Sequence, residues 1–234
     1  MYGEKLIVYK FGGTVLQNEN LVLKEIKDIL EEETKIIVVV SAIGRYPMPY
    51  STDTFYKMSK CATEKEICRM VSCGEIISSI YLSNYLRMNH IKAISVSVQE
   101  IKLEYDDGFK MNNKIEEYLE EYDVVIVPGF IGLKSDEITL LPRGGSNITA
   151  SFLASYFNCK LVIFTDVDGL YYEDPKVFKG EDRIRVASYD TLKKIALKNP
   201  NFFPILGIRY LENSNVDVII RSLDSKIGTI IRKI

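Results

Sequence analysis

The sequence predicts an α/β protein, a three-layer α/β/α sandwich with helices on both faces of a mostly parallel sheet. Apolar runs of strand length alternate with longer amphipathic segments along the 234 residues. The run at Lys35–Ser41, KIIVVVS, is apolar at nearly every position, which is typical of a central strand covered on both faces. No internal repeat or glycine- and proline-rich linker divides the chain, so we expect residues 1–234 to form one domain. A seam near 132–143 would separate two halves, about 1–140 and about 141–234, that share one sheet.

The expected strands are short, rich in valine and isoleucine, and bounded by polar residues or glycine. In chain order they are Leu6–Tyr9, Lys35–Ser41, Ala93–Val98, Asp123–Gly132, Leu161–Val167, Asp217–Ser222 and Gly228–Lys233. Each is short enough to cross a sheet once, and most are separated by a segment long enough to return the chain over one face. This order therefore favours parallel pairing.

The expected helices carry apolar residues at helical spacing or an acidic face. They are Asn18–Glu32, Glu64–Met88, Asn112–Glu121, Thr149–Phe157 and Ser188–Leu197. The longest, Glu64–Met88, contains no proline, and Gly74 is a candidate for a break in it because glycine weakens a helix interior.

Composition excludes several kinds of function. The 30 basic and 32 acidic residues give a formal net charge of −2, so no basic excess indicates nucleic-acid binding. No apolar run has the length of a membrane span and the first residues lack signal-peptide features, which predicts no membrane partner and a cytoplasmic location. The four cysteines have no C-x-x-C spacing and His90 is the one histidine, so we expect neither a zinc site nor histidine-assisted nucleophilic catalysis.

The end of the first strand has features of a phosphate site. Lys10 is followed by Phe11 and then by Gly12 and Gly13. Glycines allow backbone N–H groups to approach phosphate oxygens, and the lysine supplies a positive charge. The spacing is not that of a Walker A loop. The alternative is an ordinary strand-end turn with a surface lysine.

A second glycine-rich turn contains an arginine. Arg143 is followed by Gly144, Gly145, Ser146 and Asn147, and then by helical sequence. Ser146 or Asn147 would cap the helix, while Arg143 can hold a carboxylate or phosphate with two parallel hydrogen bonds. A merely capped helix start explains the serine and asparagine but not the Arg-Gly-Gly.

Carboxylates occupy two further positions of interest. Thr165 and Asp166 follow an apolar strand, where they can contact a nucleotide or hold magnesium through water, although an Asp-Gly turn is the alternative. Glu75 follows Gly74 in otherwise apolar sequence, so we expect it to be half-buried and paired with a ligand amine. A surface glutamate is the alternative.

Six motifs in sequence order carry a resemblance to a known family: KFGGT, VSAIGR, SCGE, PGFIG, RGGS and FTDVDGLYYEDP. The chain resembles the amino acid kinase family and, within it, the catalytic domain of aspartate kinases. The resemblance implies an amino acid kinase-like fold and phosphorylation of the side-chain carboxylate of L-aspartate by ATP with magnesium. It places the amino acid in the N-terminal half and the nucleotide in the C-terminal half.

The resemblance also implies a role for individual residues. The catalytic positions would be Lys10, which contacts the transferring phosphoryl group, and Asn147. The amino acid would be bound by Ser41, Thr52, Glu75, Arg143 and Ser146, with Glu75 on its ammonium and Arg143 on its α-carboxylate. The nucleotide would be bound by Lys10, Gly12, Gly13, Thr165, Asp166, Tyr171, Asp174 and Lys176. Magnesium would be held mainly by the ATP phosphates, and the loop Tyr46–Thr54, which contains Thr52, would become ordered on binding.

The chain departs from the family pattern at several points. Asn147 stands where the family usually has an aspartate that organises the catalytic lysine, and Val15 where it has serine. A Gly-Ala-Lys segment that closes over ATP corresponds only to Asn199–Asn201, so its lysine is missing. The regulatory ACT domains that usually follow would be absent too, although the resemblance still implies a possible homodimer. Two hypotheses result. The first is a small-molecule kinase, acting on aspartate or on another acceptor of this superfamily. The second is a catalytically weak or inactive pseudokinase that binds a nucleotide and an amino acid, either as a sensor or as the partner of an active aspartate kinase.

Overall fold

The computed structural model describes residues 5–32, 34–106, 108–172, 183–198 and 202–234. Its main sheet has the strand order β10-β12-β11-β9-β1-β2-β6-β3, in which every neighbouring pair is parallel except β11 and β12. The strands of this sheet are β1 Leu6–Phe11, β2 Lys35–Val40, β3 Ala93–Ser95, β6 Val124–Pro128, β9 Lys160–Phe164, β10 Val186–Ala187, β11 Val218–Arg221 and β12 Thr229–Ile231. The prediction of a mostly parallel sheet is confirmed.

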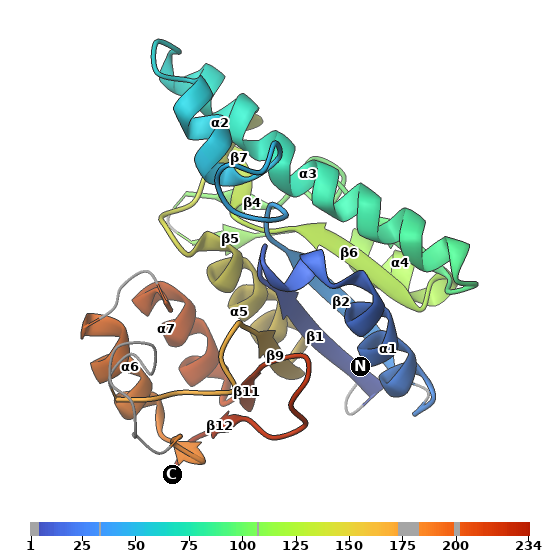
Figure 1. The fold of residues 1–234 in the computed structure, drawn as a ribbon, viewed down its shortest axis with the longest axis vertical. Coiled ribbons are helices and arrows are strands. Elements are labelled where there is room, and N and C mark those ends of the chain that lie inside the picture. The colour runs from blue at the N-terminus through green and yellow to red at the C-terminus, as the bar shows by residue number, and fades with distance from the viewer. Residues whose placement is uncertain (1–4, 33, 107, 173–182, 199–201) are drawn as a thin grey trace.

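Helices cover both faces of this sheet, as Figure 1 shows. They are α1 Glu19–Leu30, α2 Thr52–Met58, α3 Glu64–Met88, α4 Lys114–Glu121, α5 Gly145–Phe157, α6 Tyr189–Lys198 and α7 Ile205–Ser214, with a short 3-10 turn, η2, at Val15–Gln17. Helices α1 and α3 lie on one face, and α4, α5, α6 and α7 lie on the other. The three-layer α/β/α arrangement predicted from the sequence is therefore confirmed.

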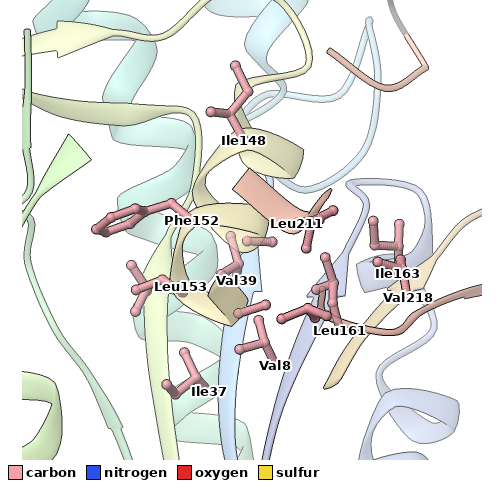
Figure 2. Close-up of a cluster of buried hydrophobic side chains, with 14 of the residues drawn as sticks. Val8, Ile37, Val39, Ile148, Phe152, Leu153, Leu161, Ile163, Leu211 and Val218 are labelled. Carbon is pink, nitrogen blue, oxygen red and sulfur yellow. The ribbon is translucent and has the colours of Figure 1, made fainter. Parts of the chain in front are cut away.

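Alternation along β1 divides the core into two layers. Leu6 and Val8 point to the α5 face, whereas Ile7, Tyr9 and Phe11 point to the face covered by α1 and α3. Figure 2 shows the α5 layer, where side chains from four strands meet α5 and α7; its labelled residues are Val8, Ile37, Val39, Ile148, Phe152, Leu153, Leu161, Ile163, Leu211 and Val218. Because α5 is covered by the sheet on one side and α7 on the other, its residues from Gly145 to Ala154 are all buried, including the polar ones.

A second, four-stranded sheet was not predicted. Its strands, in spatial order β5-β4-β7-β8, are β5 Phe109–Lys110, β4 Glu104–Tyr105, β7 Ile131–Lys134 and β8 Glu137–Leu140. The expected seam near 132–143 contains most of the β7–β8 hairpin. Strands of two to four residues are too short to produce a clear alternating pattern in the sequence.

Several boundaries differ from those predicted. Helix α3 is continuous from Glu64 to Met88, so the break considered at Gly74 is wrong. A side chain at Gly74 would lie 2.7 Å from both the Ala42 Cβ atom and the Tyr50 carbonyl oxygen, so this glycine allows close packing and does not bend the helix. Strand β3 ends at Ser95, earlier than expected. Helix α7 was not predicted; it follows Pro204 and contains Gly207, and both residue types are typical of turns. Within the described ranges, no helix combines the length and the apolar character needed to cross a membrane.

Candidate active site

A cavity of about 1010 Å³ opens at the carboxyl ends of β1, β2 and β9. Ligands of open α/β sheets bind at this edge, where loops from neighbouring strands converge. Every described residue that the sequence assigned to a site lines this one cavity. These residues are Lys10, Gly12, Gly13, Ser41, Thr52, Glu75, Arg143, Ser146, Asn147, Thr165, Asp166 and Tyr171. The other two predicted residues, Asp174 and Lys176, lie outside the described residues.

Lys10 stands near the end of β1, in the middle of the sheet, in register with Val39 on one side and Ile163 on the other. Its Nζ atom lies beside the glycine turn, 3.7 Å from where a Cβ atom on Gly12 would be. Burial lowers the pKa of Lys10 to about 8. Over the part of the chain that the structure describes, Lys10 forms no ion pair with an acidic side chain. An anion in the cavity would supply the missing counter-charge.

The turns after β1 and β2 pack directly against each other. The Gly44 N–H group donates a hydrogen bond of 2.9 Å to the Gly13 carbonyl oxygen. A side chain at Gly13 would place its Cβ atom 2.2 Å from the Ala42 carbonyl oxygen, a distance that no relaxed structure tolerates. A Cβ atom on Gly12 would have no neighbour closer than 3.7 Å. Gly13 is therefore required for packing, whereas Gly12 leaves open space beside Lys10.

Glu75 is almost fully buried, with 1% of its surface exposed. Its Oε1 atom accepts hydrogen bonds of 3.3 Å from the Ala42 N–H group and from the Thr52 hydroxyl. Its Oε2 atom is buried and has no hydrogen-bond partner among the described residues. Burial raises the pKa of Glu75 to about 8. The sequence predicted a half-buried carboxylate, and the structure places it deeper, where a cationic ligand would stabilise its ionised form.

The first turn of α5 forms another wall of the cavity. Gly144 is the N-cap residue, with a φ angle of +82° that favours glycine, and no side chain caps the helix. Ser146 and Asn147 lie inside the first turn, so the prediction that one of them is the cap is wrong. The Ser41 hydroxyl donates to the Ser146 hydroxyl at 3.0 Å, which joins the β2 turn to α5. An uncapped helix start at a cavity wall favours an anionic ligand.

Arg143 immediately precedes this turn and lines the same cavity. Its side chain is exposed to solvent at the cavity, and the Glu75 carboxylate lies on the wall that α3 contributes. Both charges act on the nearby Tyr56. Burial and the Glu75 charge raise the pKa of the Tyr56 phenol, whereas the Arg143 charge lowers it. The arginine and the glutamate thus act on one region of the cavity.

Asn147 is 7% exposed and connects two helical segments. Its Nδ2 atom donates a hydrogen bond of 2.7 Å to the Phe202 carbonyl oxygen, in the connection before α7. Its Oδ1 atom is buried without a partner among the described residues. The orientation of the amide follows from these contacts, because only the NH₂ group can donate to a carbonyl.

The turn after β9 is fixed by local hydrogen bonds. The Thr165 hydroxyl donates to the Val167 carbonyl oxygen at 2.7 Å and accepts from the Val167 N–H group at 3.2 Å. The Tyr171 hydroxyl donates to Asp168 at 2.7 Å, and Asp168 also forms an ion pair of 3.3 Å with Arg183. Asp166, two residues before Asp168, is the carboxylate of this turn that lines the cavity.

Several lining residues were not assigned from the sequence. Thr52 was expected in a loop but is the first residue of α2, which also presents Asp53 and Tyr56 to the cavity. The sequence does contain a signal for the start of this helix, because serine is a favoured N-cap residue. Ser51 caps α2 by accepting a hydrogen bond from the Thr54 N–H group. Other unassigned lining residues include Arg45, Phe130, Tyr172, Ile195, Lys198 and Phe202. Among the described residues, no group of three or more histidine, cysteine, aspartate or glutamate side chains is placed to hold a metal ion.

Comparison with known proteins agrees with this geometry. The sequence model described as the amino acid kinase family matches residues 5–222. The chain belongs to the amino acid kinase family. Aspartokinase 1 of Bacillus subtilis is 31% identical over 235 residues, which cover 93% of this chain and 58% of that protein. The aspartokinase of Helicobacter pylori is 31% identical over 243 residues, covering 97% of this chain and 59% of that protein. The chain therefore spans about three fifths of the length of these relatives.

Solved structures of several kinases have the same fold. The aspartate kinase from Synechocystis superposes with a TM-score of 0.83 at 28% identity, covering 98% of this chain and 40% of that chain. Aspartokinase III of E. coli, in complex with aspartate and ADP, superposes with a TM-score of 0.80 at 21% identity, covering 97% of this chain and 64% of that chain. A UMP kinase from Ureaplasma parvum has a TM-score of 0.71 at 16% identity and is covered over 99% of its length. The amino acid kinase fold thus serves acceptors of different chemistry, and the acceptor has to be argued from the site.

Proposed function

We propose that this protein transfers the γ-phosphoryl group of ATP to the side-chain carboxylate of L-aspartate. The observation that carries the proposal is Glu75, a buried carboxylate with one unpartnered oxygen, in the same cavity as Lys10 and Arg143. The ionised form of a buried carboxylate requires a cationic partner, and the ammonium group of an amino acid is one. The similarity of this chain to aspartokinases over most of its length supports aspartate as the acceptor.

The amino acid would be held at both ends of its backbone. Glu75 would accept hydrogen bonds from the ammonium group through the free Oε2 atom. Arg143 would bind the α-carboxylate with its planar guanidinium. Ser41, Thr52 and Ser146, whose side chains also line the cavity, would add hydroxyl contacts. Neither carbamate nor a nucleoside monophosphate carries an ammonium group beside a carboxylate, so this pair of residues favours an amino acid.

The nucleotide would bind against the glycine turn and the β9 turn. The Gly12 and Gly13 backbone and the start of α5 would surround the phosphates, where N–H groups and the helix dipole favour negative charge. Thr165, Asp166 and Tyr171 would line the rest of the nucleotide site, with Asp174 and Lys176 proposed from sequence alone. Each ligand would thus contact both halves of the chain, because Arg143 and Ser146 belong to about 141–234 and Gly12 and Gly13 to about 1–140. That the amino acid lies mainly in the first half and the nucleotide mainly in the second stays a prediction.

Magnesium fits this site as a companion of ATP. Asp166 is a carboxylate on the nucleotide side that can contact the ion directly or through water. When bound, magnesium would neutralise part of the phosphate charge, with phosphate oxygens as its main ligands.

The transfer requires no general base. The aspartate side chain is already ionised near pH 7, so its oxygen can attack the γ-phosphorus without losing a proton. A new phosphorus–oxygen bond forms as the bond to the β,γ-bridging oxygen breaks, giving aspartyl phosphate and ADP. Lys10 would offset the negative charge shared by the attacking oxygen and the transferring group.

An acceptor panel tests the proposal. ADP release from MgATP would be measured with L-aspartate, L-glutamate and UMP, and hydroxylamine would trap any acyl phosphate. We expect release with aspartate and its loss in Lys10→Ala. Lys160→Ala is the matched control, since Lys160 is exposed at the opposite end of the neighbouring strand. ATP binding without turnover on any acceptor would contradict the proposal and favour an inactive binding module. A cytoplasmic location and self-association as a homodimer stay predictions.

A further inference from the structure

A row of side chains at the cavity end of the sheet, on the face that α1 and α3 cover, ends in an arginine. The strand register places Phe11 beside Phe164 and Phe164 beside Arg221, so the row crosses the carboxyl ends of β1, β9 and β11. The two phenylalanine rings stack with their centroids 4.8 Å apart. The Arg221 guanidinium lies over the Phe164 ring, 4.6 Å from its centroid. Because Phe164 also lines the cavity, Arg221 is one side chain away from it.

The Arg221 side chain is nearly buried, with 12% of it exposed, and its charge is paired. Its Nη2 atom forms an ion pair with Glu25 of α1, and the Tyr9 hydroxyl donates to the same Glu25 oxygen at 3.1 Å. Its Nη1 atom donates to the carbonyl oxygens of Ser222 and Ser225, at 3.2 Å and 3.0 Å. A planar guanidinium with this set of partners has one orientation. It therefore fixes the loop after β11 relative to α1.

The turn after β9 is attached to the segment 221–229 at both of its ends. The Thr165 N–H group donates to the Arg221 carbonyl oxygen at 3.0 Å. The Leu170 N–H group donates to the Thr229 hydroxyl at 2.8 Å, and Thr229 is completely buried. Thr165 and Leu170 both line the cavity. One segment, which the Arg221 side chain holds in place, thus supports the β9 side of the cavity from outside.

We propose that Arg221 is a positioning residue, which holds the turn after β9 in the shape that binds the nucleotide. It would act through the Phe164 ring and through the segment 221–229. The proposal rests on the nucleotide site proposed above and adds a residue that does not itself line the cavity. Binding groups keep their geometry only where the residues behind them are fixed. A merely structural ion pair between α1 and β11 would affect stability and leave the nucleotide affinity of the folded protein unchanged.

Calorimetric titrations with ADP in the presence of magnesium, and separately with L-aspartate, distinguish these two roles. They would compare the full chain with Arg221→Met and Arg221→Lys, well below the unfolding temperature of each variant. Lys35→Met is the matched control, because Lys35 forms a part-buried ion pair of 3.0 Å with Asp123 at the opposite end of the sheet.

We expect Arg221→Met to weaken ADP binding by about threefold to tenfold, the range of coupling within one contact network, and to leave aspartate binding unchanged. Arg221→Lys keeps a positive charge near Glu25 and should restore part of the ADP affinity. Lys35→Met should bind both ligands normally. Unchanged ADP affinity in Arg221→Met, or an equal loss for aspartate, would overturn the positioning role.

Hydrogen exchange of the ligand-free protein provides a second measurement, which needs no ligand. Deuterium uptake in peptides that cover 165–171 should rise in Arg221→Met, because the supports of this turn are loosened. Peptides that cover the start of α5, on another wall of the cavity, should exchange as in the unsubstituted protein. An equal rise in both regions would indicate a general loss of stability and would overturn the inference.

A double-mutant cycle tests the link through Glu25. If Glu25 holds Arg221 in place, Glu25→Gln also weakens ADP binding, and adding Arg221→Met costs little more. Additive losses would overturn this link.

These measurements also separate the inference from the proposed reaction. A loss of ADP affinity in Arg221→Met, in a chain that does not phosphorylate aspartate, would sustain the inference and contradict the reaction. Aspartate phosphorylation by Arg221→Met with an unchanged KM for ATP would do the reverse. A chain that binds no ADP would contradict both.

Discussion

Substituting Glu75 by glutamine should change the pH dependence of stability and weaken amino-acid binding in one step. Burial raises the pKa of Glu75 from 4.5 to about 8 in the folded protein. Between these values the unfolded chain releases the proton while the folded chain keeps it. Stability from this group is therefore fully present below pH 4.5 and is lost as the pH rises towards 8. Glutamine has the same shape and no such ionisation.

The magnitude follows from the pKa difference. Each pKa unit corresponds to about 1.4 kcal/mol, so the free energy of unfolding of the unsubstituted protein should fall by roughly 3 kcal/mol between pH 5 and pH 7.5 through Glu75 alone. In Glu75→Gln this decline is absent. The NH₂ group of glutamine lacks a partner in the ligand-free site, which lowers the free energy of unfolding by about 1–3 kcal/mol. This loss is the same at every pH, so it does not change how the free energy of unfolding varies with pH.

Urea denaturation of the ligand-free protein at several pH values measures this pH dependence. The difference in unfolding free energy between Glu75→Gln and the unsubstituted protein should rise by roughly 3 kcal/mol from pH 5 to pH 7.5. Glu120→Gln, at an exposed position of α4, is the matched control and should show no such rise. Aspartate affinity should fall by at least about tenfold in Glu75→Gln, since the ammonium group loses its charged partner. A difference that stays constant with pH would refute the buried, unpartnered state of this carboxylate.

Three further predictions concern the glycine turn, the catalytic lysine and Asn147. The kcat/KM for aspartate should follow a bell-shaped pH profile centred near pH 8, because it requires ionised Glu75 and protonated Lys10, each with a pKa of about 8 in the free protein; a profile flat from pH 6 to pH 10 would contradict this. Gly13→Ala should lower the unfolding free energy by roughly 2–4 kcal/mol because its methyl group meets a backbone carbonyl, whereas Gly12→Ala should cost under about 1 kcal/mol; equal losses in urea denaturation would be inconsistent with the packing. Asn147→Asp should destabilise the fold by about 1–3 kcal/mol and give no gain in turnover, since it loses a buried donor; a large rise in rate would show that the amide is a handicap.

Most of the main sheet could be predicted because each strand leaves a clear local signal. The runs that form β1, β2 and β9 are apolar at consecutive positions, as expected for strands buried on both faces. The short strands β4 and β5 contain two residues each, and no periodicity exists over that length. Strand β4 pairs with β7, which is distant in the sequence, and β5 pairs with β4.

The site was partly predictable because some of its parts also leave a local signal in the sequence. Glycine turns at strand ends are visible in the sequence, and the topology brings them to one edge. The deep burial of Glu75 was not visible, because it depends on how α2 and the β2 turn cover α3. The contact between Asn147 and Phe202 joins residues 55 positions apart, so no local pattern could indicate it. Long-range packing decides both features.

Phosphorus NMR of the reaction mixture tests the central claim most directly. The protein would be incubated with MgATP and L-aspartate, and the spectrum followed for a new acyl phosphate resonance that grows as the ATP γ-phosphate signal declines and the ADP signals appear. The proposed site predicts this resonance with the unsubstituted protein and its loss in Lys10→Ala, where the charge beside the glycine turn is removed. Loss of ATP to inorganic phosphate without an acyl phosphate, or an equal yield from Lys10→Ala, would contradict the account.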